Sequence, residues 1–171
     1  MINIKDNSTS VTYSNPTLQN VLDYLYNPPS GHSTMIQTLL TAAFQKAESV
    51  IGRSLAVHTY QLEVDEHDGE IYLLNSPIGT ISKVEYYDGS TWNELISSEY
   101  EVFGLIEKTV SVSTVYQRIR ITYATTAYSN AVIAKLIMDL VQVWYDNRPD
   151  ADDLEQVIVN KLAKYKIWQV E

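Results

Sequence analysis

Cysteine is absent from the 171 residues of this chain, which excludes disulfide bonds, thiolate metal sites and cysteine nucleophiles. Glycine is scarce, with 6 residues, and the sequence contains no Walker loop, no G-x-G-x-x-G and no G-x-S-x-G motif. These absences argue against a phosphate-cradling loop and against the common hydrolase signatures. A chain without cysteine suits a reducing compartment.

Long apolar runs are also missing. The longest are far below the roughly 20 residues that a helix needs to cross a bilayer. The first residues, MINIKDNSTS, have no apolar core behind a basic stretch, so they do not have the pattern of a signal peptide. We therefore expect no membrane partner.

Positive charge is low, with 12 Lys and Arg residues against 21 Asp and Glu residues and a net charge of −9. Because proteins bind nucleic acid mainly by neutralising its phosphates with Lys and Arg, we do not expect a DNA-binding surface. Two interpretations of the acidic balance stay open. The acidic residues provide solubility, or they form a negatively charged surface along which DNA passes without binding.

Apolar residues make up 45% of the chain and charged residues 19%, which is typical of a globular protein. The length fits a single domain with a substantial core. Tyrosine outnumbers phenylalanine by 13 to 2. Since tyrosine buries area and keeps a polar tip, this bias suits surfaces that are wet in one state and covered in another.

Helical periodicity predicts four helices, over residues 16–26, 34–51, 130–147 and 152–165. Asn15 and Pro16 favour the first helix start, and Ser129 or Asn130 the third. Gly52 is the natural left-handed residue after the second helix. The third helix has the most continuous apolar stripe and is expected to be the most buried.

Between residues 57 and 123 the period changes to two, which predicts strands, and Asp88-Gly89 indicates a hairpin. Arg118 and Arg120 share one face of a strand, where pairing with neighbouring acids is favoured over phosphate contact. The predicted fold class is α+β, mainly a helical bundle of about four helices with an antiparallel β region inserted between the second and third. One domain, residues 16–166, lies between a flexible arm, 1–15, and a tail, 167–171.

The segment HTYQLEVDEHDGE is the best catalytic candidate, because it holds His58, His67 and several acids. Its spacing fixes no metal geometry and does not match a calcium loop, so a structural or solvated turn is favoured. We predict no enzyme activity and no cofactor. The terminal IWQVE places Trp168 near a chain end, where it packs on its own domain or inserts into a partner.

The order of several motifs resembles a known family. The carrying stretches are AESVIGRSL, LLNSPIGTISKVEYYDG, ITYATTAY and VWYDNR, and the similarity covers roughly residues 16–166. They resemble the head–tail connector family of tailed phages, the head-completion or adaptor proteins. The resemblance implies a non-enzymatic ring, usually a dodecamer of neighbouring copies, that docks under the portal protein and extends the DNA channel. It also implies a platform for the tail or the next connector, and a location in the virion after assembly in the host cytoplasm.

Two sets of residues follow as candidate sites. In relatives the C-terminal segment often reaches the portal, and the resemblance carries this role to Tyr165, Ile167, Trp168 and Val170. DNA would pass the ring transiently without specific binding, and the acidic turn with Asp65, Glu66 and Asp68 is the candidate channel lining. Two alternatives remain: a tail-completion or minor tail protein, and a small metal-dependent hydrolase.

Overall fold

The computed structural model describes residues 1–26, 28–146 and 151–167. Its internal contacts divide the chain into two compact units. The β unit comprises residues 1–11 and 56–128, and the helical unit comprises residues 12–55 and 129–171. Each unit therefore combines segments that are distant in the sequence. In the described part of the chain, no helix is both long and apolar enough to cross a membrane.

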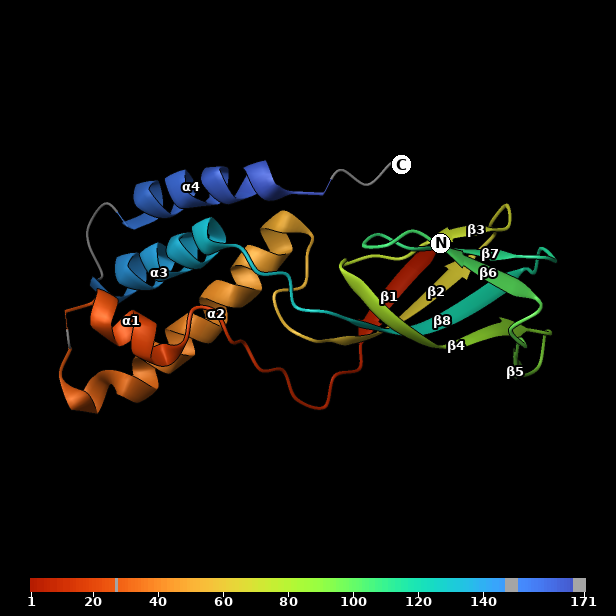
Figure 1. Ribbon diagram of the computed structural model, residues 1–171, viewed down its shortest axis with the longest axis horizontal. Helices are drawn as coiled ribbons and strands as arrows, with labels where there is room; N and C mark the ends of the chain where they lie inside the picture. The colour runs from red at the N-terminus through yellow and green to blue at the C-terminus, as the bar shows by residue number, and fades with distance from the viewer. Residues whose placement is uncertain (27, 147–150, 168–171) are drawn as a thin grey trace. The chain divides into compact units, whose positions relative to one another are not determined.

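The helical unit contains the four predicted helices, labelled in Figure 1. They are α1 (Leu18–Tyr24), α2 (Ser33–Ile51), α3 (Ala131–Asp146) and α4 (Ala151–Leu162), with short 3-10 turns η1 (Ser30–His32) before α2 and η2 (Ala163–Tyr165) after α4. The predicted bounds differ from the observed ones by at most three residues. The helical period was a reliable signal because each apolar stripe runs along one face over several turns.

Helix ends show where local chemistry agreed with the prediction. Gly52 adopts the left-handed conformation, φ 65°, at the end of α2, as predicted. The side chain of Asn130 accepts hydrogen bonds from the backbone N–H groups of Val132 and Ile133, so it caps α3. The start of α1 differs: Thr17, not Asn15, is the N-cap, in a reciprocal capping box with Asn20.

The core of the helical unit forms where α3 packs between α2 and α4 and α1 packs against α2 and α3. The stripe predicted for α3 is buried, including Leu140 and Val141, neither of which is exposed to solvent. On α2, Ile36, Leu40 and Phe44 are buried in the same way. Seven of the 16 residues of α3 are buried, against six of 19 in α2, so the prediction that α3 is the most buried helix is confirmed.

The β unit contains eight strands in two antiparallel sheets. The five-stranded sheet has the order β1-β2-β8-β4-β5, and the three-stranded sheet has the order β3-β7-β6. The strands are β1 (Ile2–Asp6), β2 (Thr59–Asp65), β3 (Glu70–Tyr72), β4 (Ile78–Tyr87), β5 (Trp92–Glu94), β6 (Tyr100–Phe103), β7 (Thr109–Val112) and β8 (Arg118–Thr125). The predicted hairpin at Asp88-Gly89 joins β4 to β5.

The two sheets share one apolar core. Ile119, Ile121 and Tyr123 of β8 are buried in it, and they alternate with Arg118, Arg120 and Thr122 on the opposite face. Ile71 and Val110 belong to the core from the three-stranded sheet. The β unit is therefore a small sandwich, whose two sheets contribute apolar side chains to one core.

The predicted fold class was wrong. The described chain is about 37% helical and 27% strand, with two antiparallel sheets, so it is not mainly a helical bundle. Strands β3, β5, β6 and β7 have only three or four residues each, and their pairing is decided by distant partners. Strands were predicted across this region, but without their pairing the second sandwich-like unit was taken as an insert between two helices.

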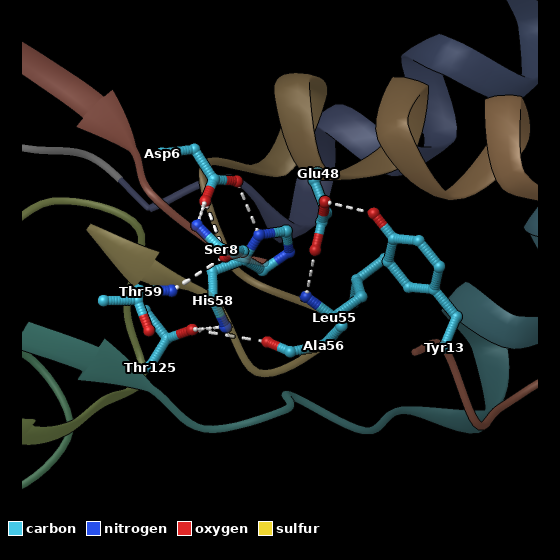
Figure 2. A network of polar contacts seen from close by, with 9 residues as sticks. All are labelled: Asp6, Ser8, Tyr13, Glu48, Leu55, Ala56, His58, Thr59 and Thr125. Atoms are coloured by element: carbon cyan, nitrogen blue, oxygen red, sulfur yellow. Dashed lines mark hydrogen bonds and ion pairs between the residues drawn. The ribbon is translucent and has the colours of Figure 1, made fainter. Parts of the chain in front are cut away.

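The N-terminal segment also differs from the prediction of a flexible arm. Residues 2–6 form β1, which pairs with β2 in the register Ile2↔Val64 to Asp6↔Tyr60. Figure 2 shows Asp6 bound to Nδ1 of His58 at 2.8 Å and to Ser8. These contacts hold a strand whose own burial is slight, which explains why its sequence gave no strand signal. A single folding domain over residues 16–166 stays a prediction.

Candidate functional site

The proposed channel-lining acids lie at the turn after β2, but they differ in their surroundings. Asp65 accepts a hydrogen bond from Nε of Arg118 at 2.8 Å, so its charge is compensated. Glu66 is exposed and has a left-handed backbone, φ 58°. Asp68 is exposed and accepts a hydrogen bond from the backbone N–H of Glu70 at 3.2 Å. Two of the three acids therefore present negative charge to solvent.

Two further acids lie on the outer face of the three-stranded sheet: Glu70, the last residue of the HTYQLEVDEHDGE segment, and Glu101, which the sequence analysis did not single out. Ser111 of β7 is paired with Glu70 of β3 on one side and with Glu101 of β6 on the other. Directly opposed residues share one face of a sheet, and both glutamates are exposed. The four exposed acids of the turn and of this sheet face, Glu66, Asp68, Glu70 and Glu101, are here called the acidic face.

The outer face of the five-stranded sheet behaves differently, because its charges compensate one another. Arg120 donates two hydrogen bonds to Glu85, at 2.8 and 2.9 Å, and Lys83 donates to the same carboxylate at 2.7 Å. Arg118 pairs with Asp65 and with Glu63. The prediction that both arginines pair with acids is confirmed.

These ion pairs around Lys83, Arg118 and Arg120 are here called the ion ladder. Glu85 is its most buried charged group, with 3% of its surface exposed. The hydrogen bonds from Arg120, helped by Lys83, lower the pKa of its carboxyl group. Trp92 of β5 covers the arginines, with Cζ of Arg120 4.3 Å from its ring centroid. Three of the β unit's basic side chains are thus paired within the ion ladder, and they do not compensate the charges of the acidic face.

The two histidines of the HTYQLEVDEHDGE segment do not converge. His58 is buried and contacts Asp6, and Figure 2 shows its backbone N–H bound to Oγ1 of Thr125 at 3.0 Å. His67 accepts a hydrogen bond from the backbone of Gly69, and burial lowers the pKa of its imidazole. Within residues 1–26, 28–146 and 151–167, no group of three His, Cys, Asp or Glu side chains is placed to hold a metal ion.

The predicted portal-binding residues fall at the end of the described chain. Tyr165 belongs to η2, and the backbone N–H of Ile167 donates to the carbonyl of Ile51 at 3.1 Å, which ties the chain end to α2. Both side chains are half-buried. Trp168 and Val170 lie outside the described residues.

Another contact in the helical unit was missed in the sequence. Tyr13 stacks on Phe44 of α2 with ring centroids 4.2 Å apart, and its hydroxyl donates to Glu48 at 2.9 Å. Figure 2 shows the second oxygen of Glu48 bound to the backbone N–H of Leu55 at 2.6 Å. Segments before α2 and after it are thereby fixed to the same helix.

No protein-family model matches the sequence, and no curated protein matches it. Solved structures do match the fold. A chain in the "neck of empty GTA particle computed with C6 symmetry" aligns with a TM-score of 0.71 and 12% identity, over 100% of this chain and 97% of that chain. A chain in the "virion of native gene transfer agent (GTA) particle" aligns with a TM-score of 0.72 and 11% identity, over 98% and 97%.

A third match is a chain in the "neck of native GTA particle computed with C12 symmetry", with a TM-score of 0.68 and 12% identity over 100% of this chain and 97% of that chain. At such low identity the likeness concerns the fold. It extends over both units and nearly the whole length of each matched chain. The fold is therefore shared with chains of gene transfer agent particles, which agrees with the head–tail connector resemblance of the sequence motifs.

Proposed function

We propose that the protein is a structural component of a virion neck, located at the interface between head and tail. The observation that carries the proposal is the full-length fold match to chains from particle necks. In this role it works by assembly, as a ring of copies between the portal and the tail or the next connector, built in the host cytoplasm. The six-fold and twelve-fold symmetries of those necks support a ring.

The ring is tested by mixing the purified protein with the portal protein of the same particle and imaging the product by electron microscopy. We expect a ring of copies on one end of the portal. Binding to tail tubes without portal binding would favour the alternative, a tail-completion or minor tail protein. Rings on neither partner would overturn the proposal.

The C-terminal segment is the proposed portal contact. Ile167 ends the described chain and is tied to Ile51, so truncation after it keeps that hydrogen bond. We expect a chain lacking residues 168–171 to keep its melting temperature and lose portal docking. A matched control removes residues 1–4 at the other end, which should cost stability through β1 but spare docking. Normal docking of the C-terminal truncation would refute this contact.

The acidic face is the proposed lining of the DNA channel. It carries Glu66, Asp68, Glu70 and Glu101, and repulsion between these carboxylates and phosphates would let DNA slide without binding. Asp65 contributes less, because Arg118 compensates its charge.

Charge reversal tests the lining. Replacing Glu70 and Glu101 by lysine should slow DNA ejection from assembled particles, with the largest effect at low salt because salt screens the interaction over about 10 Å at 0.1 M. The control reverses Asp152 and Asp153, exposed acids at the start of α4. Unchanged ejection in the first variant, or equal slowing in both, would place the channel elsewhere.

No observation favours the small metal-dependent hydrolase. In the described part of the chain, the acids of its candidate segment form no metal-holding group, and Asp65 is paired with Arg118. A melting temperature raised by Mn²⁺ or Mg²⁺ would reopen this alternative.

A further inference from the structure

A groove runs between α3 and α4 in the helical unit. Its volume is about 290 Å³. The residues that line it are Asp139, Gln142, Val143, Asp146, Leu154, Val157, Ile158 and Lys161. The apolar stripe of α4 is wider than its own unit covers: Ile158 and Leu162 are buried, but Val157 is 50% exposed. The groove therefore offers an apolar floor that α3 leaves partly open.

A complementary apolar protrusion lies in the β unit, at the loop between β6 and β7. Leu105 is 93% exposed there, and Phe103 and Ile106 are more than half exposed. Gly104, φ 90°, allows the tight turn, and a Cβ at this position would lie 2.0 Å from the carbonyl oxygen of Glu107. The turn thus exposes large apolar side chains to water. This exposure is unfavourable in free energy, and exposed apolar patches of this kind often mark an interaction site.

Charges of opposite sign lie beside the loop and along the α4 edge of the groove. The loop is flanked by exposed Glu101 and Glu107. On the α4 edge, Lys161 is exposed, and Lys164 follows it one turn later. The α3 edge is acidic, with Asp146 and with Asp139, which is engaged by Lys135 and by the hydroxyl of Tyr24. The α4 edge is therefore the part of the rim that suits the negative loop.

We propose that the loop of one copy, with Leu105 and Ile106 at its tip, docks in the α3–α4 groove of the next copy. The occupant is a second copy because a closed ring needs a heterologous contact, in which two different patches of the same chain fit each other. The loop and the groove are such a pair of patches: both are apolar, and the acids of the loop match Lys161 on the α4 edge of the groove. The inference rests on the proposed ring and names the residues that join its subunits.

Cross-linking tests the contact directly, because the chain has no cysteine of its own. Cysteines are introduced at Leu105 and Val157 in one variant, and rings assembled on the portal are oxidised. If the two positions meet between neighbours, reducing-agent-sensitive ladders of dimers, trimers and larger species appear on denaturing gels. Each single-cysteine variant should give no ladder, since one thiol links at most two chains.

The matched control combines Leu105→Cys with Thr38→Cys, an exposed position on α2 away from the groove lining. It should leave the chains unlinked. Monomers alone from the first variant, with free thiols or with an internal disulfide, would overturn the inference. If wild-type rings are seen by microscopy in that case, the proposed function stands while this contact fails. If the wild type forms no ring, the proposed function fails and the inference falls with it.

Two substitutions test, without introducing cysteine, whether the loop contact is needed for ring formation. Leu105→Asp should abolish ring formation and leave the melting temperature of the free chain unchanged, since the side chain touches little of its own fold. The control, Ile96→Asp, changes another exposed apolar residue of the same unit and should form normal rings. Rings of normal stability with Leu105→Asp would contradict the proposal.

Charge exchange tests the rim. Lys161→Glu should weaken assembly at low salt, and Glu107→Lys in the same chain should restore it by re-forming the pair in the opposite sense. Rescue of this kind separates a contact between copies from a loss of local helix stability, which Glu107→Lys could not repair. Absence of any rescue would remove the charge pair from the interface.

Discussion

The two units of the chain divide its charge unequally. The β unit carries 12 acidic and 5 basic residues, a net charge of −7, whereas the helical unit carries 9 acidic and 7 basic residues, a net charge of −2. In the β unit, Lys83, Arg118 and Arg120 form ion pairs, and Lys108 donates to the carbonyl of Gly79 at 2.5 Å. The negative charge of the protein is thus concentrated on one unit, most of whose cations are already engaged.

The units also differ in how they are stabilised. The helical unit has an apolar core between three long helices, with polar groups mostly at caps and surfaces. The β unit adds to its sandwich core a partly buried ion ladder centred on Glu85. Apolar substitutions should therefore affect both units, while changes in charge and pH should affect the β unit more.

The largest expected effect comes from charging the helical core. Leu140→Asp places an unpaired carboxylate at a position with no solvent exposure, at a cost of several kcal/mol against a total stability of about 5–15 kcal/mol. We expect loss of cooperative helix melting by circular dichroism. Val132→Asp, on the same helix but half exposed, should melt close to wild type. Similar melting of the two variants would mean that α3 is wrongly oriented.

A smaller effect is expected from breaking the ion ladder. Glu85→Ala leaves Arg120 and Lys83 without their carboxylate in a partly buried site, which should cost about 3 kcal/mol. Glu63→Ala removes a longer, more exposed pair with Arg118 and should cost about 0.5 kcal/mol. Chemical denaturation measures both. Equal costs would show that burial of Glu85 adds nothing to its pairing.

The ladder also predicts a pH dependence. Because Arg120 and Lys83 lower the pKa of Glu85 in the folded state below its ordinary value of 4.5, its stabilisation is complete above that pH. It is lost as the pH falls through the lower, folded-state pKa. The melting temperature of the wild type should therefore fall more steeply below pH 4.5 than that of Glu85→Gln. Parallel curves for the wild type and Glu85→Gln would contradict the assignment.

The smallest effect is expected at the end of α2. Gly52 has φ 65°, and a Cβ there would meet no atom within 4 Å, so the cost of Gly52→Ala is backbone strain alone, about 1 kcal/mol. Gly52→Asn should cost less, since asparagine tolerates the left-handed region. Thermal denaturation of both variants checks the order. A neutral alanine substitution would show that the helix ends elsewhere.

The sequence predicted the helical unit almost completely. The stripe on α3, the cap at Asn130 and the stop at Gly52 depend on neighbours three or four residues away, so local pattern was sufficient. The strands β2 and β8 were found for a similar reason, because they alternate over seven or more residues, and β4 was found from the hairpin signal that follows it. The pairing of Arg118 and Arg120 with acids also followed from their shared strand face.

The same reasoning failed where the partners are distant. Strand β1 is defined by its pairing with β2, nearly 60 residues later, and its own residues give no strand pattern. The acidic face required knowing that Glu70 and Glu101 both oppose Ser111. The groove between α3 and α4 required knowing how far α3 covers the stripe of α4.

The sequence by itself determined the four helices, the strand-rich character of residues 57–123, the acidic balance and the lack of cysteine chemistry, because each is a property of composition or of contacts within a few residues. Only the tertiary structure decided that the strands form a second sandwich-like unit, that Asp65 is compensated by Arg118, and that Leu105 and the α3–α4 groove stay uncovered. Strand register and surface exposure depend on residues far apart in the chain, and no local pattern encodes them.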